Sequence, residues 1–100
     1  MTRDGTEDVI DVLIVDDNFF NIDVLEMLIG SNFPHNNKMT SCYSGAEALD
    51  AVKQWLDSGQ PMYNLMLFDI NMPQMTGFEL EYKVREVLDD TETKIAAVTA

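Results

Sequence analysis

The stretch that decides the fold is Leu65–Gly77, which reads LMLFDINMPQMTG. It begins with four apolar residues, meets a single acid at Asp69, and then turns through a segment that contains Pro73 and Gly77. A short continuous apolar run predicts a strand that is covered on both faces, as in a parallel sheet. The carboxylate of Asp69 is therefore expected at the rim of that sheet, where the chain leaves the core.

Two more apolar runs, Val12–Val15 and Ile95–Val98, predict buried strands, and the mixed segment Met39–Tyr43 predicts an edge strand. Between the strands, apolar residues recur with the period of a helix. This alternation predicts an α/β fold with a doubly wound, open parallel sheet. The residues expected on the buried helix faces are Val24, Leu25, Leu28 and Ile29 in the first helix, Ala48, Leu49, Val52, Trp55 and Leu56 in the second, and Leu80, Val84, Val87 and Leu88 in the third.

Two helix starts carry the pattern of a capping box, Ser44 with Glu47 and Thr76 with Glu79. The length of 100 residues suits a single domain. We expect a polar tail over residues 1–10 and one domain over residues 11–100, with no internal repeat or linker. The strand-plus-helix units are 26 to 30 residues long by the expected strand starts, so a fifth strand would begin beyond residue 100.

The composition narrows the class of function. The chain has eighteen acidic and six basic residues, which give a formal net charge of -12. Because this charge repels phosphate backbones, we do not expect this segment to bind nucleic acid directly. The lone cysteine, Cys42, permits no internal disulfide and predicts a small buried side chain. No apolar segment approaches the roughly 20 residues of a membrane span. We therefore expect a cytoplasmic protein.

Acidic and hydroxyl side chains follow the predicted strands. Asp16 and Asp17 follow the first strand, Asp69 ends the third, and Thr99 closes the fourth. One such acid alone would be interpreted as a helix cap, a role that Asn18 could also fill. Several carboxylates at one rim repel one another unless a cation neutralises them, and an all-oxygen site suits Mg²⁺. A carboxylate beside Mg²⁺ can act as a nucleophile toward phosphorus, with Thr99 offering its hydroxyl to a phosphoryl oxygen.

Three segments, VLIVDDNFFN, FDINMPQMTG and AAVTA, resemble the successive motifs of the receiver domain of two-component response regulators, most closely those of hybrid histidine kinases. The resemblance runs from about Val12 to Ala100. It implies a flavodoxin-like receiver fold that takes a phosphoryl group from a phosphohistidine on a histidine kinase or a histidine phosphotransfer protein. Such a domain is a signalling module rather than an enzyme, and it assists only its own phosphorylation and dephosphorylation.

The same resemblance assigns roles at the rim. Asp69 is implied as the phosphoacceptor and Thr99 as the switch hydroxyl, with Ala100 leaving the site open. Asp17 and Asp69 are implied to hold Mg²⁺ through their carboxylates, Asn71 through its backbone carbonyl, and Asp16 mostly through water. The implied metal-binding set is therefore Asp16, Asp17, Asp69 and Asn71.

The chain departs from the receiver pattern at its C-terminal end. Receivers use a lysine and an aromatic switch residue on a fifth strand, and the 100 residues contain neither that strand nor the last helices. Lys94 is expected at the opposite end of the sheet, where it cannot replace that lysine. We expect residues 11–100 to form an incomplete receiver that self-associates through its fourth strand, Ile95–Thr99, which is left as an edge.

Two other functions remain open. A degenerate receiver would bind partners without being phosphorylated, and the missing lysine favours that reading. A phosphatase of the haloacid dehalogenase type also places a nucleophilic acid after a parallel strand. Those enzymes use a second Asp two residues later, where this chain has Asn71, and turnover of a phosphate monoester would distinguish them.

Overall fold

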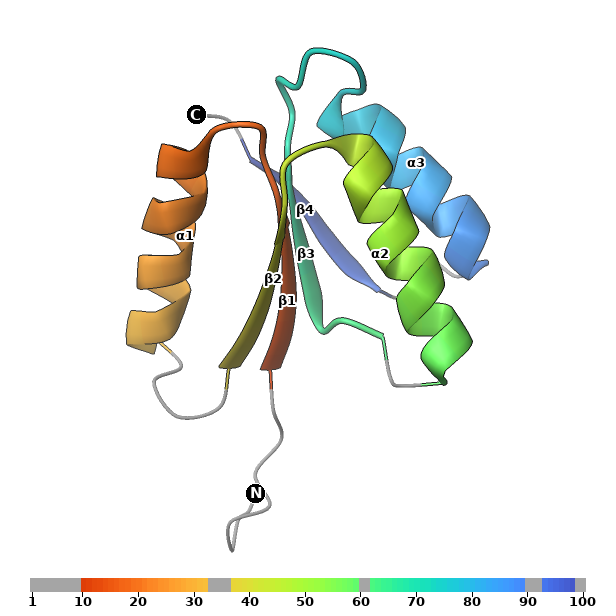
Figure 1. The fold of residues 1–100 in the computed structure, drawn as a ribbon, viewed down its shortest axis with the longest axis horizontal. Coiled ribbons are helices and arrows are strands. Elements are labelled where there is room, and N and C mark those ends of the chain that lie inside the picture. Colours follow the sequence, from red (N-terminus) through yellow and green to blue (C-terminus); the bar gives the residue numbers. More distant parts are fainter. Residues whose placement is uncertain (1–9, 33–36, 60–61, 90–92, 99–100) are drawn as a thin grey trace, which may run out of the picture.

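The computed structural model describes residues 10–32, 37–59, 62–89 and 93–98 of the chain. Within these residues, strands and helices alternate throughout, as the sequence pattern predicts (Figure 1). The elements are β1 (Ile10–Val15), α1 (Phe19–Asn32), β2 (Asn37–Cys42), α2 (Gly45–Ser58), β3 (Leu65–Asp69), α3 (Gly77–Leu88) and β4 (Lys94–Val98).

The strands form one parallel sheet in the order β2-β1-β3-β4. This order confirms the predicted α/β fold and the prediction that the second strand lies at an edge. β1 and β3 are neighbours, and Val15 pairs with Phe68 near their carboxyl ends. The acids that follow these two strands are therefore delivered to the same rim. Lys94 pairs with Leu65, so it lies at the opposite end of β3 from Asp69, as predicted.

Helices cover both faces of the sheet, with α1 on one side and α2 and α3 on the other (Figure 1). Alternate residues of β1 point to opposite faces of the sheet and pack in the two helix-covered cores. Val12 and Ile14 belong to the buried cluster on the α1 side, whereas Leu13 and Val15 belong to the cluster on the α2 and α3 side. β1 is thus buried on both faces, which explains why its sequence is a continuous apolar run.

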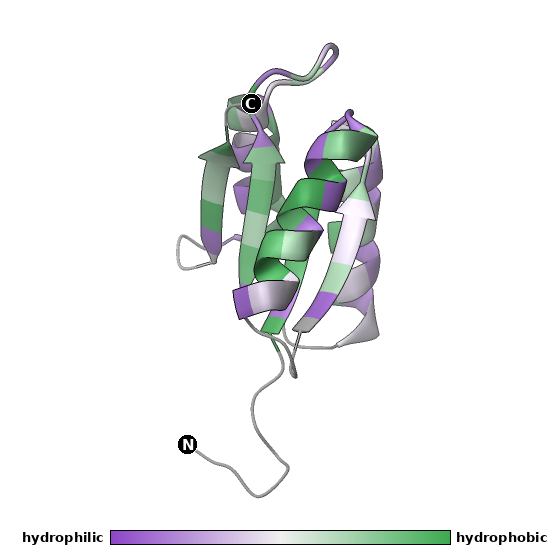
Figure 2. Cartoon of the chain, turned by 90° about the vertical axis from the view of Figure 1, so that its left-hand side faces the viewer, coloured by the Kyte–Doolittle hydropathy of each residue, from purple (hydrophilic) through white to green (hydrophobic). Residues whose placement is uncertain are grey.

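The buried face of α1 differs from the prediction. Ile22 and Ile29 are buried against the sheet, but Val24 and Leu28 are 39% and 55% exposed. The helix is apolar on nearly all sides, so its periodicity does not single out one face. Figure 2 shows hydrophobic residues along the outward side of this helix. The same correction applies to Leu56 in α2, which is exposed.

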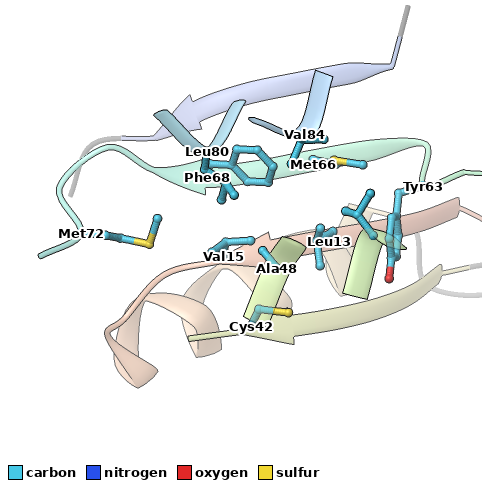
Figure 3. Close-up of a cluster of buried hydrophobic side chains, with 11 residues drawn as sticks. Leu13, Val15, Cys42, Ala48, Tyr63, Met66, Phe68, Met72, Leu80 and Val84 are labelled. Atoms are coloured by element: carbon cyan, nitrogen blue, oxygen red, sulfur yellow. The ribbon is translucent and has the colours of Figure 1, made fainter. Parts of the chain in front are cut away.

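The larger core lies between the sheet and the helices α2 and α3 (Figure 3). Phe68 and Met66 of β3 are fully buried in it, and Cys42 is buried as predicted. Tyr63 closes one end of this core and stacks on Trp55 with ring centroids 4.5 Å apart. All four residues predicted for the inner face of α3 contact this core: Leu80, Val84, Val87 and Leu88.

The predicted capping boxes form to different extents. In α3, Thr76 Oγ1 accepts from the Glu79 amide and Glu79 Oε1 accepts from the Thr76 amide, which completes the box. In α2, Ser44 Oγ accepts from the Glu47 amide, but Glu47 Oε1 accepts from the amide of Tyr43. The Glu47 carboxylate therefore holds the backbone of Tyr43, the residue before the cap. This contact fixes the β2–α2 loop.

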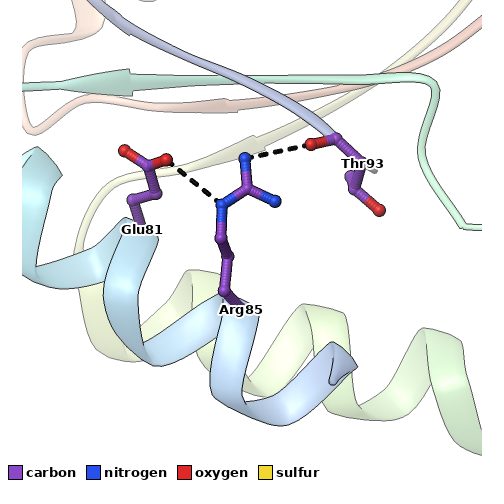
Figure 4. A network of polar contacts seen from close by, with 3 residues as sticks. All are labelled: Glu81, Arg85 and Thr93. Atoms are coloured by element: carbon purple, nitrogen blue, oxygen red, sulfur yellow. Dashed lines mark hydrogen bonds and ion pairs between the residues drawn. The ribbon is translucent and has the colours of Figure 1, made fainter. Parts of the chain in front are cut away.

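One arginine ties α3 to the start of β4 (Figure 4). Arg85 Nε donates to Glu81 Oε2 at 3.2 Å, one turn earlier in the helix, and Arg85 Nη2 donates to the carbonyl of Thr93 at 3.1 Å. This contact holds the last described strand against α3 at the end of the sheet opposite Asp69.

Candidate functional site

Asp16 and Asp17 leave the sheet at the end of β1. The amide of Asp16 donates to the carbonyl of Cys42 at 3.1 Å, so this residue continues the pairing of β1 with β2 by one step. The Asp16 side chain is 4% exposed, whereas Asp17 is exposed. The two adjacent acids therefore differ in environment, one desolvated and the other open to solvent.

Two hydrogen bonds fix the carboxylate of Asp16. The amide of Asn18 donates to its Oδ1 at 2.9 Å, and Asn21 Nδ2 donates to its Oδ2 at 3.2 Å. Burial raises the pKa of Asp16, the bonds from Asn18 and Asn21 oppose that rise, and the neighbouring charges of Asp69 and Asp17 add to it. A cation bound beside Asp16 would therefore favour the ionised form of its carboxyl group.

Asp69 is the last residue of β3, and its side chain is 6% exposed. Its Oδ1 accepts from the amide of Asn71 at 3.1 Å. The loop after it returns at once to the strand end, because the amide of Gly77 donates to the carbonyl of Ile70 at 3.2 Å. The start of α3 is thereby held beside Asp69, which keeps this carboxylate at the rim.

The three acids converge. One carboxylate oxygen from each of Asp16, Asp17 and Asp69 can be chosen so that all lie within 4.8 Å of one another. This spacing and the all-oxygen donor set fit a hard divalent cation such as Mg²⁺, which also keeps water ligands. The acidic cluster could therefore bind a metal ion.

A pocket of about 240 Å³ opens beside Asp17. Its walls come from the β2–α2 loop and from the β3–α3 loop, two segments that lie some 30 positions apart in the sequence. Sequence reasoning named Asp17, Ser44 and Pro73 for other roles but did not predict this pocket. The full lining is Asp17, Tyr43, Ser44, Gly45, Met72, Pro73, Gln74 and Met75.

Apolar side chains extend from the acidic rim along the outer face of α1. Phe19 and Phe20 are 68% and 72% exposed, and Met27 is 71% exposed. Phe19 packs on Tyr43, with ring centroids 4.7 Å apart, and so joins this helix face to the wall of the pocket. We call this surface the α1 face; it comprises Phe19, Phe20, Val24, Met27 and Leu28.

The sequence matches the Response regulator receiver domain family over residues 12–100. The chain belongs to this family. The receiver is similar to the "Hybrid signal transduction histidine kinase L" of Dictyostelium discoideum, with 37% identity over 75 residues, which are 75% of this chain and 4% of that protein. It is also similar to the "Two-component response regulator 24" of Arabidopsis thaliana, with 33% identity over 99% of this chain and 70% of that protein.

Solved receivers share the fold. The receiver domain of the histidine kinase CKI1 from Arabidopsis thaliana, solved with Mg²⁺ and BeF₃⁻, superimposes with a TM-score of 0.73 at 28% identity, covering 89% of this chain and 64% of that one. The same domain with Mg²⁺ gives a TM-score of 0.71 at 29% identity, covering 87% of this chain and 65% of that one. This receiver thus spans just under two-thirds of those solved domains and a small part of the hybrid kinase.

The structure brings together the receiver's three predicted acids, and Asn71 lies beside them, exposed, with its amide bonded to Asp69. Thr99 and Ala100 lie outside the described residues, so their roles stay predictions.

Asn18 is the N-terminal cap of α1, because its Oδ1 accepts from the amides of Phe20 and Asn21. Sequence reasoning missed the contact from Asn21 to Asp16, although the Asn itself stands in the quoted motif. Among the described helices, none has the length and apolar character needed to cross a bilayer.

Proposed function

We propose that this receiver accepts a phosphoryl group on Asp69 from a phosphohistidine of a histidine kinase or a histidine phosphotransfer protein. The observation that carries the proposal is the position of Asp69, which ends a buried strand with its carboxylate beside those of Asp16 and Asp17. A carboxylate oxygen of Asp69 attacks phosphorus and forms a P–O bond while the P–N bond to the imidazole breaks. The imidazole nitrogen keeps the electron pair and takes a proton from solvent.

The residues of the rim would have different roles in this transfer. Asp16, Asp17 and Asp69 would hold Mg²⁺, with the Asn71 carbonyl as a further ligand. Bound Mg²⁺ supplies charge stabilisation for the transferring phosphoryl oxygens. The amide of Asn71 holds Asp69 Oδ1, which orients the second oxygen of that carboxylate. Thr99 would donate its hydroxyl to the phosphoryl group. The Mg²⁺ and BeF₃⁻ bound by the similar CKI1 receiver support this assignment.

The partner would approach along the α1 face. A phosphohistidine must reach Asp69 from beyond the carboxyl ends of the strands, and α1 begins at that rim. Phe20 and Met27 are exposed, and their apolar surface is of the kind that becomes buried when a partner docks. We propose that the domain is a cytoplasmic signalling module, a setting that agrees with its single cysteine being a buried free thiol.

Incubation with a small phosphodonor and Mg²⁺, followed by intact-mass measurement, tests the proposal. The parent chain should gain one acid-labile phosphoryl group, and Asp69→Asn should gain none because the substitution keeps the shape and removes the nucleophile. Asp57→Asn, at an exposed position near the end of α2, is the matched control and should label like the parent. Normal labelling of Asp69→Asn would refute the assignment.

Two outcomes would favour the alternatives instead. A parent chain that is never labelled but still binds a phosphotransfer protein would act as a degenerate receiver. Sustained turnover of a phosphate monoester would indicate a phosphatase of the haloacid dehalogenase type, which Asn71 in the place of an acid argues against.

A further inference from the structure

Asn21 contacts the acidic cluster without being an acid itself. Its Nδ2 donates to Asp16 Oδ2 at 3.2 Å, while the amide of Asn18 donates to Asp16 Oδ1 at 2.9 Å. Each oxygen of a carboxylate that is only 4% exposed therefore has its own donor. Because one donor comes from the backbone and the other from a side chain, only the Asn21 bond depends on the residue type.

The side chain of Asn21 is not needed to cap α1. The cap is the side chain of Asn18, whose Oδ1 accepts from the amide of Phe20 at 2.8 Å and from the amide of Asn21 at 3.3 Å. Asn21 serves that cap through its backbone, which any residue other than Pro provides. Its side-chain amide is directed instead to Asp16, five residues before it in the chain and outside the helix.

We infer that Asn21 is a positioning residue for the cation site, an inference that rests on the proposed function and extends it. Charge repulsion from Asp17 and Asp69 drives the Asp16 carboxylate to turn away from the cluster when no cation is bound. The Asn21 amide holds Asp16 in place against that repulsion. The three carboxylates therefore keep their spacing before the cation arrives, and binding requires less reorganisation.

Metal affinity is the quantity that this role changes. Removing a group that orients a metal ligand typically costs about 10- to 100-fold in metal affinity. We expect Asn21→Ala to raise the dissociation constant for Mg²⁺ about tenfold, the lower end of that range, because the Asn18 amide still holds one oxygen of Asp16. Asn21→Leu, which keeps the approximate size but has no donor, should have the same effect.

Calorimetric titration of the whole chain with MgCl₂ measures that constant directly. The matched control is Asn32→Ala at the other end of α1, where Asn32 Nδ2 donates to the carbonyl of Leu28 at 2.8 Å. This change also removes an asparagine side-chain hydrogen bond from α1, and it should leave Mg²⁺ affinity unchanged. Melting temperatures in EDTA report the structural effect of each substitution separately from metal binding.

The outcomes separate this inference from the proposed function. Weaker Mg²⁺ binding by both Asn21 variants, with parent-like melting in EDTA and a silent Asn32→Ala control, supports the positioning role. Binding by the parent and both Asn21 variants with equal constants overturns the positioning role alone. An equal loss in Asn32→Ala overturns it too, because the effect would then belong to α1 as a whole. A parent chain that does not bind Mg²⁺ overturns both this role and the proposed metal site.

Discussion

Gly77, the first residue of α3, packs directly against the backbone of Asp69. A β-carbon at position 77 would lie 2.6 Å from the carbonyl oxygen of Asp69 and 3.1 Å from the Cα of Ile70. Both neighbours are backbone atoms, which cannot move without displacing the end of β3. Only glycine lets α3 begin this close to the candidate phosphoacceptor, so the helix start and the site share one constraint.

This contact predicts that Gly77→Ala destabilises the fold. We expect the free energy of unfolding to fall by about 1–3 kcal/mol, the usual cost of forcing an extra carbon into a packed site. Urea denaturation followed by circular dichroism measures the change. Gly45→Ala is the matched control, because a β-carbon there would meet the flexible side chain of Met75, with its Sδ at 2.7 Å. That variant should lose less stability than Gly77→Ala, because the Met75 side chain can move aside, and an equal loss in both variants would contradict the prediction.

Mg²⁺ is expected to stabilise the chain in the absence of phosphate, because it relieves repulsion among the three clustered acids. At about 100 times its dissociation constant, a ligand that binds only the folded state adds roughly 2.7 kcal/mol. Asp17→Asn should remove most of that gain, whereas Asp57→Asn, which lies in α2, should keep it. Thermal melts with and without MgCl₂ provide the measurement. If the melting temperature of the parent chain were the same with and without Mg²⁺, the result would contradict the proposed metal site.

The buried thiol predicts a loss of stability at alkaline pH. Burial, helped by the negative charge of Glu47, raises the pKa of Cys42 from 9.0 to about 11. Because the folded-state pKa is the higher one, the stabilising contribution is complete below pH 9 and is lost as the pH rises from 9 to about 11. The expected loss is roughly 2–3 kcal/mol across that window.

Urea melts at a series of pH values between 8 and 11 test this expectation, with Cys42→Ala as the comparison. The variant should lose stability less steeply with pH. Some dependence should remain, because burial also raises the pKa of Tyr63. Parallel curves for the parent and Cys42→Ala would show that the thiol does not contribute.

The 100-residue chain is expected to self-associate through β4. Among the described residues, this strand pairs with β3 on one side and forms the edge of the sheet, and Ala97 on it is exposed. An exposed strand edge offers unpaired backbone groups to a second chain. Sedimentation velocity over a concentration series should show dimers or larger species, and Ala97→Lys should reduce them by placing a charge on the edge. A monomer at every concentration would refute the expectation.

The sequence by itself determined the sheet and the chemistry of its rim. The continuous apolar runs of β1 and β3 required burial on both faces, which inner strands receive in an α/β sheet with helices on both sides. Once those strands are parallel and adjacent, Asp16, Asp17 and Asp69 must emerge at the same end. The helix α3 was equally determined, because a single apolar stripe and a complete capping box mark its face and its start.

The tertiary structure alone decided the rest, because these features depend on which surfaces meet in space. α1 is apolar on nearly all sides, so only its packing on Val12 and Ile14 selects Ile22 and Ile29 as the buried side and leaves Phe20 exposed. The carboxylate of Glu47 could have accepted from the amide of Ser44, as in a complete capping box, but in the folded chain it accepts from the amide of Tyr43. The pocket beside Asp17 and the bond from Asn21 to Asp16 likewise arise from side-chain geometry, which residue types and spacing do not specify.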